Sequence, residues 1–221
     1  MNSAQKIAII VVSAVLLGVL TAGYLGFVPG VSDVMGTNKP IDLGVKYSSS
    51  DLDSVGQKIA DINLESEVAE LHLTSSELTA MVASMSEGSE QFPLEQVQVK
   101  LSETGVKLSG TLNMEKFRKL AEEGEISPSL KSQIETAANI VKTNPSVFLD
   151  ADIIAFNGDA QIVINTAKIG QISIPQDQLE ENVDSINENL KEVLDSLEIQ
   201  IESISTMNDI VDIQFCLNQT R

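Results

Sequence analysis

Residues 7–28 form one uninterrupted apolar run, IAIIVVSAVLLGVLTAGYLGFV, which contains no charged side chain and follows Lys6. As a helix that rises about 1.5 Å per residue, this run would span roughly 33 Å. The hydrocarbon core of a bilayer is about 30 Å thick, so the run is long enough to cross it. No comparable run follows in the chain. The sequence therefore predicts a single transmembrane helix over residues 7–28, surrounded by membrane lipid.

A cleaved signal peptide is the alternative interpretation of the same segment. Signal peptides carry small residues just before the cleavage site, and Thr21-Ala22-Gly23 fit that feature. The apolar character continues beyond this point through Tyr24 and Phe27, whose rings suit the membrane interface. We therefore expect an uncleaved signal anchor at the cell membrane, with a secreted or periplasmic protein as the alternative localisation.

The anchor divides the chain into parts and sets its orientation. Counting lysines does not favour an N-terminus inside the cytoplasm, because Lys6 precedes the run whereas Lys39 and Lys46 follow it. Long domains cross the membrane largely regardless of charge, so the C-terminal part is expected outside the cytoplasm. The expected parts are a short cytoplasmic tail (1–6), the transmembrane helix (7–28), a linker rich in Gly, Pro, Ser and Asp (29–50) and an extracytoplasmic domain (51–221).

The composition excludes several kinds of partner and site. The formal net charge is -18, which repels nucleic acid and disfavours broad docking on anionic lipid headgroups. The chain has one cysteine, so neither an intramolecular disulfide nor a cysteine-based metal site can form. This residue, Cys216, lies in the apolar run IVDIQFCL, where a buried small side chain is expected.

Hydrophobic periodicity predicts an α+β domain, in which an antiparallel meander sheet packs with a few helices and curves around a long one. One strand followed by a helix is expected in VAELHLTSSELTAMVASM, where Thr74-Ser-Ser-Glu77 fits a capping box. Ser50 is a candidate N-cap for the first helix of the domain. The other helices are expected over residues 51–61, 114–123, 128–142 and 175–197.

Alternating apolar residues predict the remaining strands. The first hairpin is expected in LEQVQVKLSETGVKLSGTL, with Gly105 suited to a positive φ. Asn157-Gly158 predicts the turn of a second hairpin between VFLDADIIAF and AQIVIN. A further strand is expected in KIGQISI, and two strands, about 198–205 and 209–217, close the chain.

No residue pattern predicts catalysis or a metal site. His72 is the single histidine and is expected on a strand surface. Asp150, Asp152 and Asp159 come close enough in the second hairpin to suggest Ca²⁺, but the glycine and distal glutamate of a calcium loop are missing. Nucleophile-elbow, zinc-protease and phosphate-loop motifs are absent from the sequence. The sequence therefore predicts a non-enzymatic protein without a cofactor.

The strongest binding signal is apolar surface on the long helix and on the last strand. An ordinary hydrophobic core is the plain interpretation of such surface. The sharper interpretation is a groove for a hydrophobic ligand, which the membrane anchor would hold close to lipid. The groove candidates are Leu179, Val183, Ile186, Leu190, Val211, Ile213 and Phe215.

The order of these segments resembles a known group of proteins. LTSSELTAMV is followed by VQVKLSETGVKLSGTL and then by KIGQISIPQDQLEENVDSINENL, across roughly residues 70–217. This order is similar to that of bacterial membrane-anchored proteins of the tubular lipid-binding (TULIP-like) kind. The resemblance implies binding of lipid or an envelope component in a groove, without catalysis. Such proteins usually have a glycine-rich closing turn, where this chain has Met207-Asn208-Asp209.

Three hypotheses of function follow. The first is a single-pass, membrane-anchored extracytoplasmic protein that binds lipid or another hydrophobic envelope component without catalysis. The alternative is a structural or interaction module of an envelope complex, which docks an envelope protein through a sheet edge or the helix 175–197. An extracytoplasmic hydrolase that uses His72 and Asp152 is the third.

Overall fold

The computed structural model describes residues 39–62, 68–88, 92–122, 144–170, 172–174 and 176–217. Within these ranges the chain is α+β, with two antiparallel sheets and helices packed against them, which confirms the predicted fold class. The predicted transmembrane helix over 7–28, the linker residues 29–38 and the expected helix over 128–142 lie outside the described residues.

The larger sheet is a five-stranded antiparallel meander. It runs in chain order through β2 (Leu94–Leu101), β3 (Gly105–Leu112), β4 (Ser146–Phe156), β5 (Asp159–Ile169) and β6 (Ile172–Ser173). Both predicted hairpins are confirmed, because β2 pairs with β3 and β4 pairs with β5. Asn157 and Gly158 have φ values of 53° and 86°, the left-handed pair that a two-residue hairpin turn requires.

The smaller sheet joins segments that lie far apart along the chain. It has the order β1 (Ala69–Thr74), β8 (Ile210–Leu217) and β7 (Ile199–Met207), and all pairs are antiparallel. The expectation of one meander sheet is therefore wrong. β1 leads into the helix α3 (Ser75–Gly88) and does not pair with β2. Its strand partner is β8, which follows it by more than 130 residues.

The helix α3 closes the free edge of β2 with hydroxyl groups. The amide of Leu101 donates to Ser75 Oγ at 2.8 Å, and the amide of Val99 donates to Thr79 Oγ1 at 2.8 Å. Further along, Ser86 Oγ donates to the carbonyl of Leu94. Side chains of α3 thus occupy backbone groups that a neighbouring strand would otherwise use, which protects the edge from pairing with another chain.

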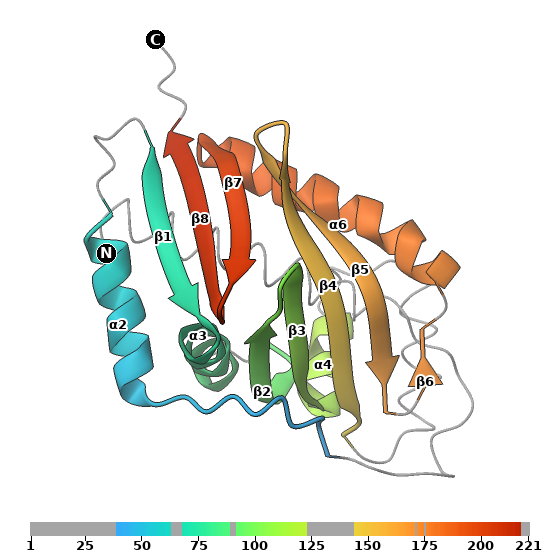
Figure 1. Cartoon of the computed structure of the whole chain (residues 1–221). Coiled ribbons are helices and arrows are strands. Elements are labelled where there is room, and N and C mark those ends of the chain that lie inside the picture. Colours follow the sequence, from blue (N-terminus) through green and yellow to red (C-terminus); the bar gives the residue numbers. More distant parts are fainter. Residues whose placement is uncertain are drawn as a thin grey trace.

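The other edge of this sheet is closed by the helix α6 (Gln176–Ser196), close to the predicted range 175–197. Asn187 Oδ1 accepts the amide of Ile162 on β5 at 2.8 Å, and Asn187 Nδ2 donates to the Ile162 carbonyl at 3.1 Å. The helix packs on β5 and β7, and it passes behind the upper part of β4 and β5 (Figure 1). Because β5 and β7 belong to different sheets, α6 holds the two sheets together.

Polar contacts at two places also join the sheets. At the upper end, the amide of Ile201 on β7 donates to the carbonyl of Gly158 at 2.7 Å. At the turn between β7 and β8, the carboxylate of Asp209 accepts hydrogen bonds from Ser75 Oγ and from Lys100 Nζ on β2, the latter at 2.9 Å. A single cluster of buried apolar residues spans both sheets, α2, α3, α4 and α6, so the described chain has one continuous core.

The remaining helices lie close to their predicted positions. α2 covers Ser49–Ala60 and α4 covers Met114–Glu122. The expected cap at Ser50 is wrong, because the N-cap is Ser48, two residues earlier. Asp51 accounts for this start, since its carboxylate accepts the Ser48 amide at 2.7 Å and compensates the positive end of the helix.

Two expectations about turns are also corrected. Gly105 does not have a positive φ; it is required because a Cβ there would lie 2.1 Å from the carbonyl oxygen of Ala151 on β4. The segment KIGQISI is not one strand, since Gly170, with a φ of 60°, turns the chain between β5 and the short β6.

The closing hairpin forms without glycine. Asn208 and Asp209 adopt φ values of 52° and 67°, and they connect β7 to β8 as a two-residue turn. Asn and Asp tolerate this left-handed conformation better than other non-glycine residues. The two predicted closing strands are therefore confirmed.

Candidate functional site

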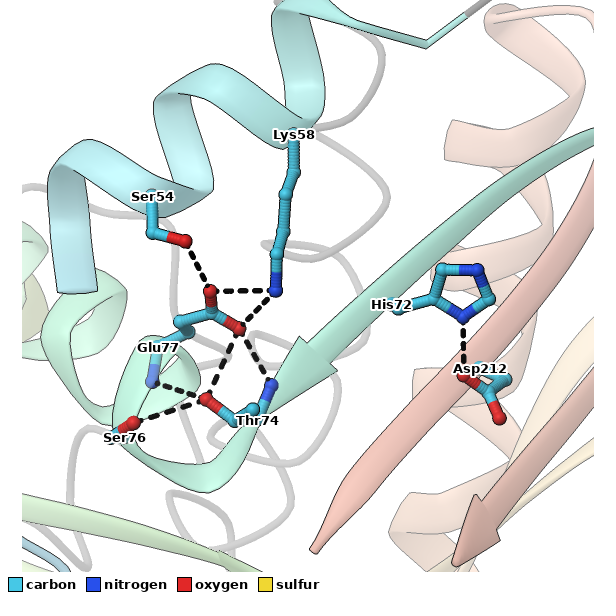
Figure 2. Close-up of polar contacts among 7 residues, drawn as sticks. All are labelled: Ser54, Lys58, His72, Thr74, Ser76, Glu77 and Asp212. Carbon is cyan, nitrogen blue, oxygen red and sulfur yellow. Dashed lines mark hydrogen bonds and ion pairs between the residues drawn. The ribbon is translucent and has the colours of Figure 1, made fainter.

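The most polar group in the interior is the carboxylate of Glu77, at the start of α3 (Figure 2). It accepts the amide of Thr74 at 2.8 Å, and the Glu77 amide donates to Thr74 Oγ1 at 3.2 Å. These reciprocal bonds confirm the predicted capping box. Two side chains of α2 complete the cluster, because Ser54 Oγ donates at 2.6 Å and Lys58 Nζ lies 2.7 Å from Glu77 Oε1.

The Glu77 cluster stabilises the fold rather than presenting a reactive acid. Burial by itself raises the pKa of the Glu77 carboxyl, but hydrogen bonds, chiefly from Lys58 and Ser54, outweigh it and lower the pKa. Both carboxylate oxygens are occupied by donors, so the group stays ionised at neutral pH. Its role is to fasten α2 onto the first turn of α3.

A second polar group lies on the solvent-facing side of the smaller sheet. His72 on β1 is exposed, as predicted, and its Nδ1 is hydrogen-bonded to the carboxylate of Asp212, its partner across the strands (Figure 2). Its Nε2 lies 3.6 Å from a carboxylate oxygen of Glu70. Both ring nitrogens therefore face carboxylates rather than a hydroxyl or a thiol. This arrangement orients the imidazole but lacks the nucleophile of a catalytic triad.

The same face continues as a row of polar contacts. Gln214 Nε2 donates to Glu70 at 2.9 Å, and Ser203 Oγ donates to Gln214 Oε1 at 3.0 Å. These bonds link β1, β8 and β7 across the sheet.

Cys216 lies on this polar face, so the expectation of a buried cysteine is wrong. Strand alternation places it opposite to buried Phe215, and it is only partly buried. Its thiol approaches the Glu202 carboxylate at 3.2 Å. Burial and the nearby Glu202 raise the pKa of the Cys216 thiol, which keeps it in the less reactive protonated form.

The three aspartates of the second hairpin have separate partners. Asp150 lies 3.7 Å from Lys107 Nζ, Asp152 accepts the Thr104 hydroxyl at 2.7 Å, and Asp159 lies 2.9 Å from Lys191 Nζ. Among the described residues, no group of three or more His, Cys, Asp or Glu side chains is placed to hold a metal ion.

The groove candidates lie in the interior of the domain. Leu179, Ile186 and Leu190 on α6 are buried, and Val183 is partly buried against them. The candidates on β8 (Val211, Ile213 and Phe215) are also buried, and all seven belong to or pack against the same core cluster. Both sets thus belong to one apolar core, in which α6 lies on β5 and β7.

An exposed apolar patch lies on the β4–β5 hairpin. Ile154, Phe156 and Val163 are 42 %, 53 % and 45 % exposed, and we refer to these three residues as the hairpin patch. Ile154 and Phe156 are two positions apart on β4, and Val163 faces Asp152, so Val163 and Ile154 are diagonal neighbours on one face. Ile162, on the opposite face, is buried next to α6. The hairpin patch therefore points away from α6 and the core.

The hairpin patch is not among the candidates predicted from the sequence, although the chain contains a signal for it. Apolar residues occupy consecutive positions at Ile153-Ile154 and at Ile162-Val163-Ile164. Successive strand residues point to opposite faces, so such runs indicate apolar side chains on both faces of a strand. Here one face is covered by the core and the other lacks a cover among the described residues.

No family model, no curated protein and no solved structure matches the chain. No helix in the described part of the chain is both long and apolar enough to cross a membrane.

Proposed function

We propose that this chain is a membrane-anchored, extracytoplasmic, non-enzymatic domain that docks onto a hydrophobic component of the cell envelope. The observation that carries the proposal is the hairpin patch, in which large apolar side chains face solvent on one side of the β4–β5 hairpin. Contiguous exposed apolar surface of this kind marks interaction sites on folded proteins. The uncharged run 7–28 supports the anchored part of the proposal, as a transmembrane helix ahead of the α+β domain.

The closed edges of the larger sheet specify how docking takes place. The hydroxyls of α3 occupy the edge of β2, and Asn187 occupies the edge of β5 at Ile162. Addition of a partner strand along these edges would require those bonds to break. A partner would therefore meet the face of the hairpin rather than its edge.

The test compares the full-length chain with two surface variants after solubilisation of its native membranes in mild detergent. The patch variant carries Ile154→Ser and Phe156→Ser. The matched control carries Leu52→Ser, which changes an apolar residue on α2 that is 39 % exposed. The wild type and the control should migrate in a complex on native gels, and the patch variant should migrate as the free chain. Equal migration of all three would contradict docking through the patch.

Binding of a lipid or another hydrophobic ligand inside the domain is the second candidate function. It is favoured by the single apolar core, to which six of the groove candidates belong and against which Val183 packs. A ligand there would replace contacts that Leu179, Ile186 and Leu190 make with the core. The resemblance to tubular lipid-binding proteins points to the same kind of ligand.

A photoreactive palmitate that carries a diazirine tests this second candidate in membranes that contain the full-length chain. Binding in the interior should label peptides from α6 (Gln176–Ser196) and β8 (Ile210–Leu217). Labelling of the run 7–28 serves as the internal control for contact with the bilayer. Label confined to 7–28 would rule out an interior lipid site.

A further inference from the structure

From the hairpin patch and its surroundings, and resting on the proposed function, we infer that the partner is another protein with an apolar centre and a basic rim. It approaches the end of the domain that lies farthest from the membrane anchor. Three features of the chain favour such a partner: the position of the hairpin in the domain, the length of the tether and the charge around the patch.

The hairpin and the start of the described chain lie at opposite ends of the domain. Residues 39–48 form an arm that crosses the lower end of β2 and β3 (Figure 1). The amide of Leu43 in this arm donates to Gln98 Oε1 on β2 at 2.7 Å, which fixes the arm to the sheet. The turn at Asn157 and Gly158 lies at the upper end (Figure 1). A membrane anchor that precedes the arm therefore enters the domain at the end opposite to Phe156.

The tip of the hairpin patch lies far from the point at which the tether enters the domain. β4 has 11 residues, and at about 3.3 Å per residue it is roughly 36 Å long. Residues 29–38, between the apolar run and the arm, reach about 36 Å when fully extended. With the arm nearest the bilayer and β4 upright, Phe156 lies roughly 36 Å above the arm, and it meets lipid only if the domain tilts onto its side or turns over. This position favours a protein farther from the membrane as the occupant over the anchoring bilayer.

The charge next to the patch indicates which charged side chains would surround the apolar centre of the partner's binding surface. Asp152 is the cross-strand partner of Val163, and its neighbour Thr104 contributes a neutral hydroxyl, so the carboxylate charge is not compensated there. Asp159 is the partner of Phe156, and its charge is paired with Lys191. With a net charge of -18, a second copy of this chain would be repelled, as would an anionic lipid surface. Lysine or arginine side chains around an apolar centre would complement the patch.

Photocrosslinking tests this inference with the full-length chain in its native membranes. p-Benzoyl-phenylalanine is placed at the position of Val163, and at the position of Leu52 in a control. We expect a protein adduct at position 163 that is absent at position 52, and that falls about fivefold between about 0.05 and 0.5 M salt because screening weakens charge pairing. Asp152→Asn should lower the yield about two- to threefold, and the crosslinked partner peptides should be rich in Lys and Arg.

The other outcomes separate this inference from the proposed function. A lipid-sized adduct alone at position 163 would overturn the protein partner while leaving docking onto a hydrophobic envelope component intact. A dimer of this chain, or a protein adduct whose yield ignores both salt and Asp152→Asn, would overturn the basic rim. No adduct at position 163, together with native-gel migration that Ile154→Ser and Phe156→Ser do not change, would overturn both proposals.

Discussion

Thr79 on α3 forms hydrogen bonds with both backbone groups of Val99 on β2. Its hydroxyl oxygen accepts the Val99 amide at 2.8 Å and donates to the Val99 carbonyl at 3.1 Å. Asn187 on α6 forms the same pair of bonds with Ile162 at the opposite side of the sheet. Side chains of helices therefore bond to the strand backbone at both positions, where a further strand would otherwise pair.

The variant Thr79→Val tests this closure of the β2 edge. Valine keeps the shape of the side chain but leaves two buried backbone groups of Val99 without a partner, which costs about 1–3 kcal/mol. Urea unfolding should show a lower midpoint with an unchanged slope. Ser84→Ala, at an exposed position on the same helix, is the control and should change stability by less than about 0.5 kcal/mol. Equal stability of the two variants would contradict a role for the hydroxyl.

The Glu77 cluster predicts a pH-dependent contribution to stability. The pKa of this carboxyl is lowered in the folded state, so its contribution is fully present above the unfolded value of about 4.5 and is lost as pH falls through the folded value. Glu77→Gln should destabilise the protein by about 1–3 kcal/mol at neutral pH, because it leaves Lys58 and Ser54 without an ionised acceptor.

Urea unfolding of the wild type and Glu77→Gln at a series of pH values measures this contribution. The difference in the free energy of unfolding should be constant above about pH 6 and should shrink below about pH 4.5. Glu87→Gln, at an exposed position near the end of α3, provides the matched control. A difference for Glu77→Gln that does not change with pH would exclude the ionised carboxylate as its source.

Gly158 is required at the junction of the two sheets for two reasons. Its φ of 86° is strained for any other residue, and a Cβ would lie 2.8 Å from the Cγ atom of Gln200 on β7. Gly158→Ala should therefore destabilise more than Gly170→Ala, whose φ is 60° but whose Cβ would meet nothing within 4 Å. We expect roughly 1 kcal/mol for Gly170→Ala from backbone strain alone.

Hydrogen exchange of the Ile201 amide reports on the same junction. This amide donates to the Gly158 carbonyl, so its exchange should accelerate in Gly158→Ala and stay unchanged in Gly170→Ala. Equal exchange in both variants would show that the backbone at Gly158 does not hold β7 against the hairpin.

Cys216 should react slowly with iodoacetamide. Burial, followed by the nearby Glu202, raises the pKa of its thiol above the ordinary value of 9.0, so little thiolate is present at neutral pH. Glu202→Gln removes one cause of the shift and should speed alkylation at pH 8 about two- to threefold. Intact-mass measurements over time give the rate, and Glu192→Gln on the exposed side of α6 is the control. An unchanged rate in Glu202→Gln would show that its charge does not act on the thiol.

Local patterns in the sequence were sufficient for most elements of the described chain. The capping box at Thr74 and Glu77 depends on residues three positions apart, and Asn157-Gly158 forms its turn from neighbouring residues. Such contacts form within one turn or one hairpin, so spacing along the chain is enough to predict them. Gly105 marks the limit of this approach, because its constraint comes from the backbone of Ala151 on another strand.

The sequence by itself determined the α+β class, the two hairpins and the long amphipathic helix, because hydrophobic periodicity acts over a few residues. Only the tertiary structure decided that β1 pairs with β8, where His72 meets Asp212 at a separation of 140 residues. It also decided which apolar faces are covered: Ile162 is buried beside Asn187, whereas Val163 next to it faces solvent. Hydrophobic periodicity indicates that one face of an element is apolar, but the segments that pack on this face can lie far away in the chain.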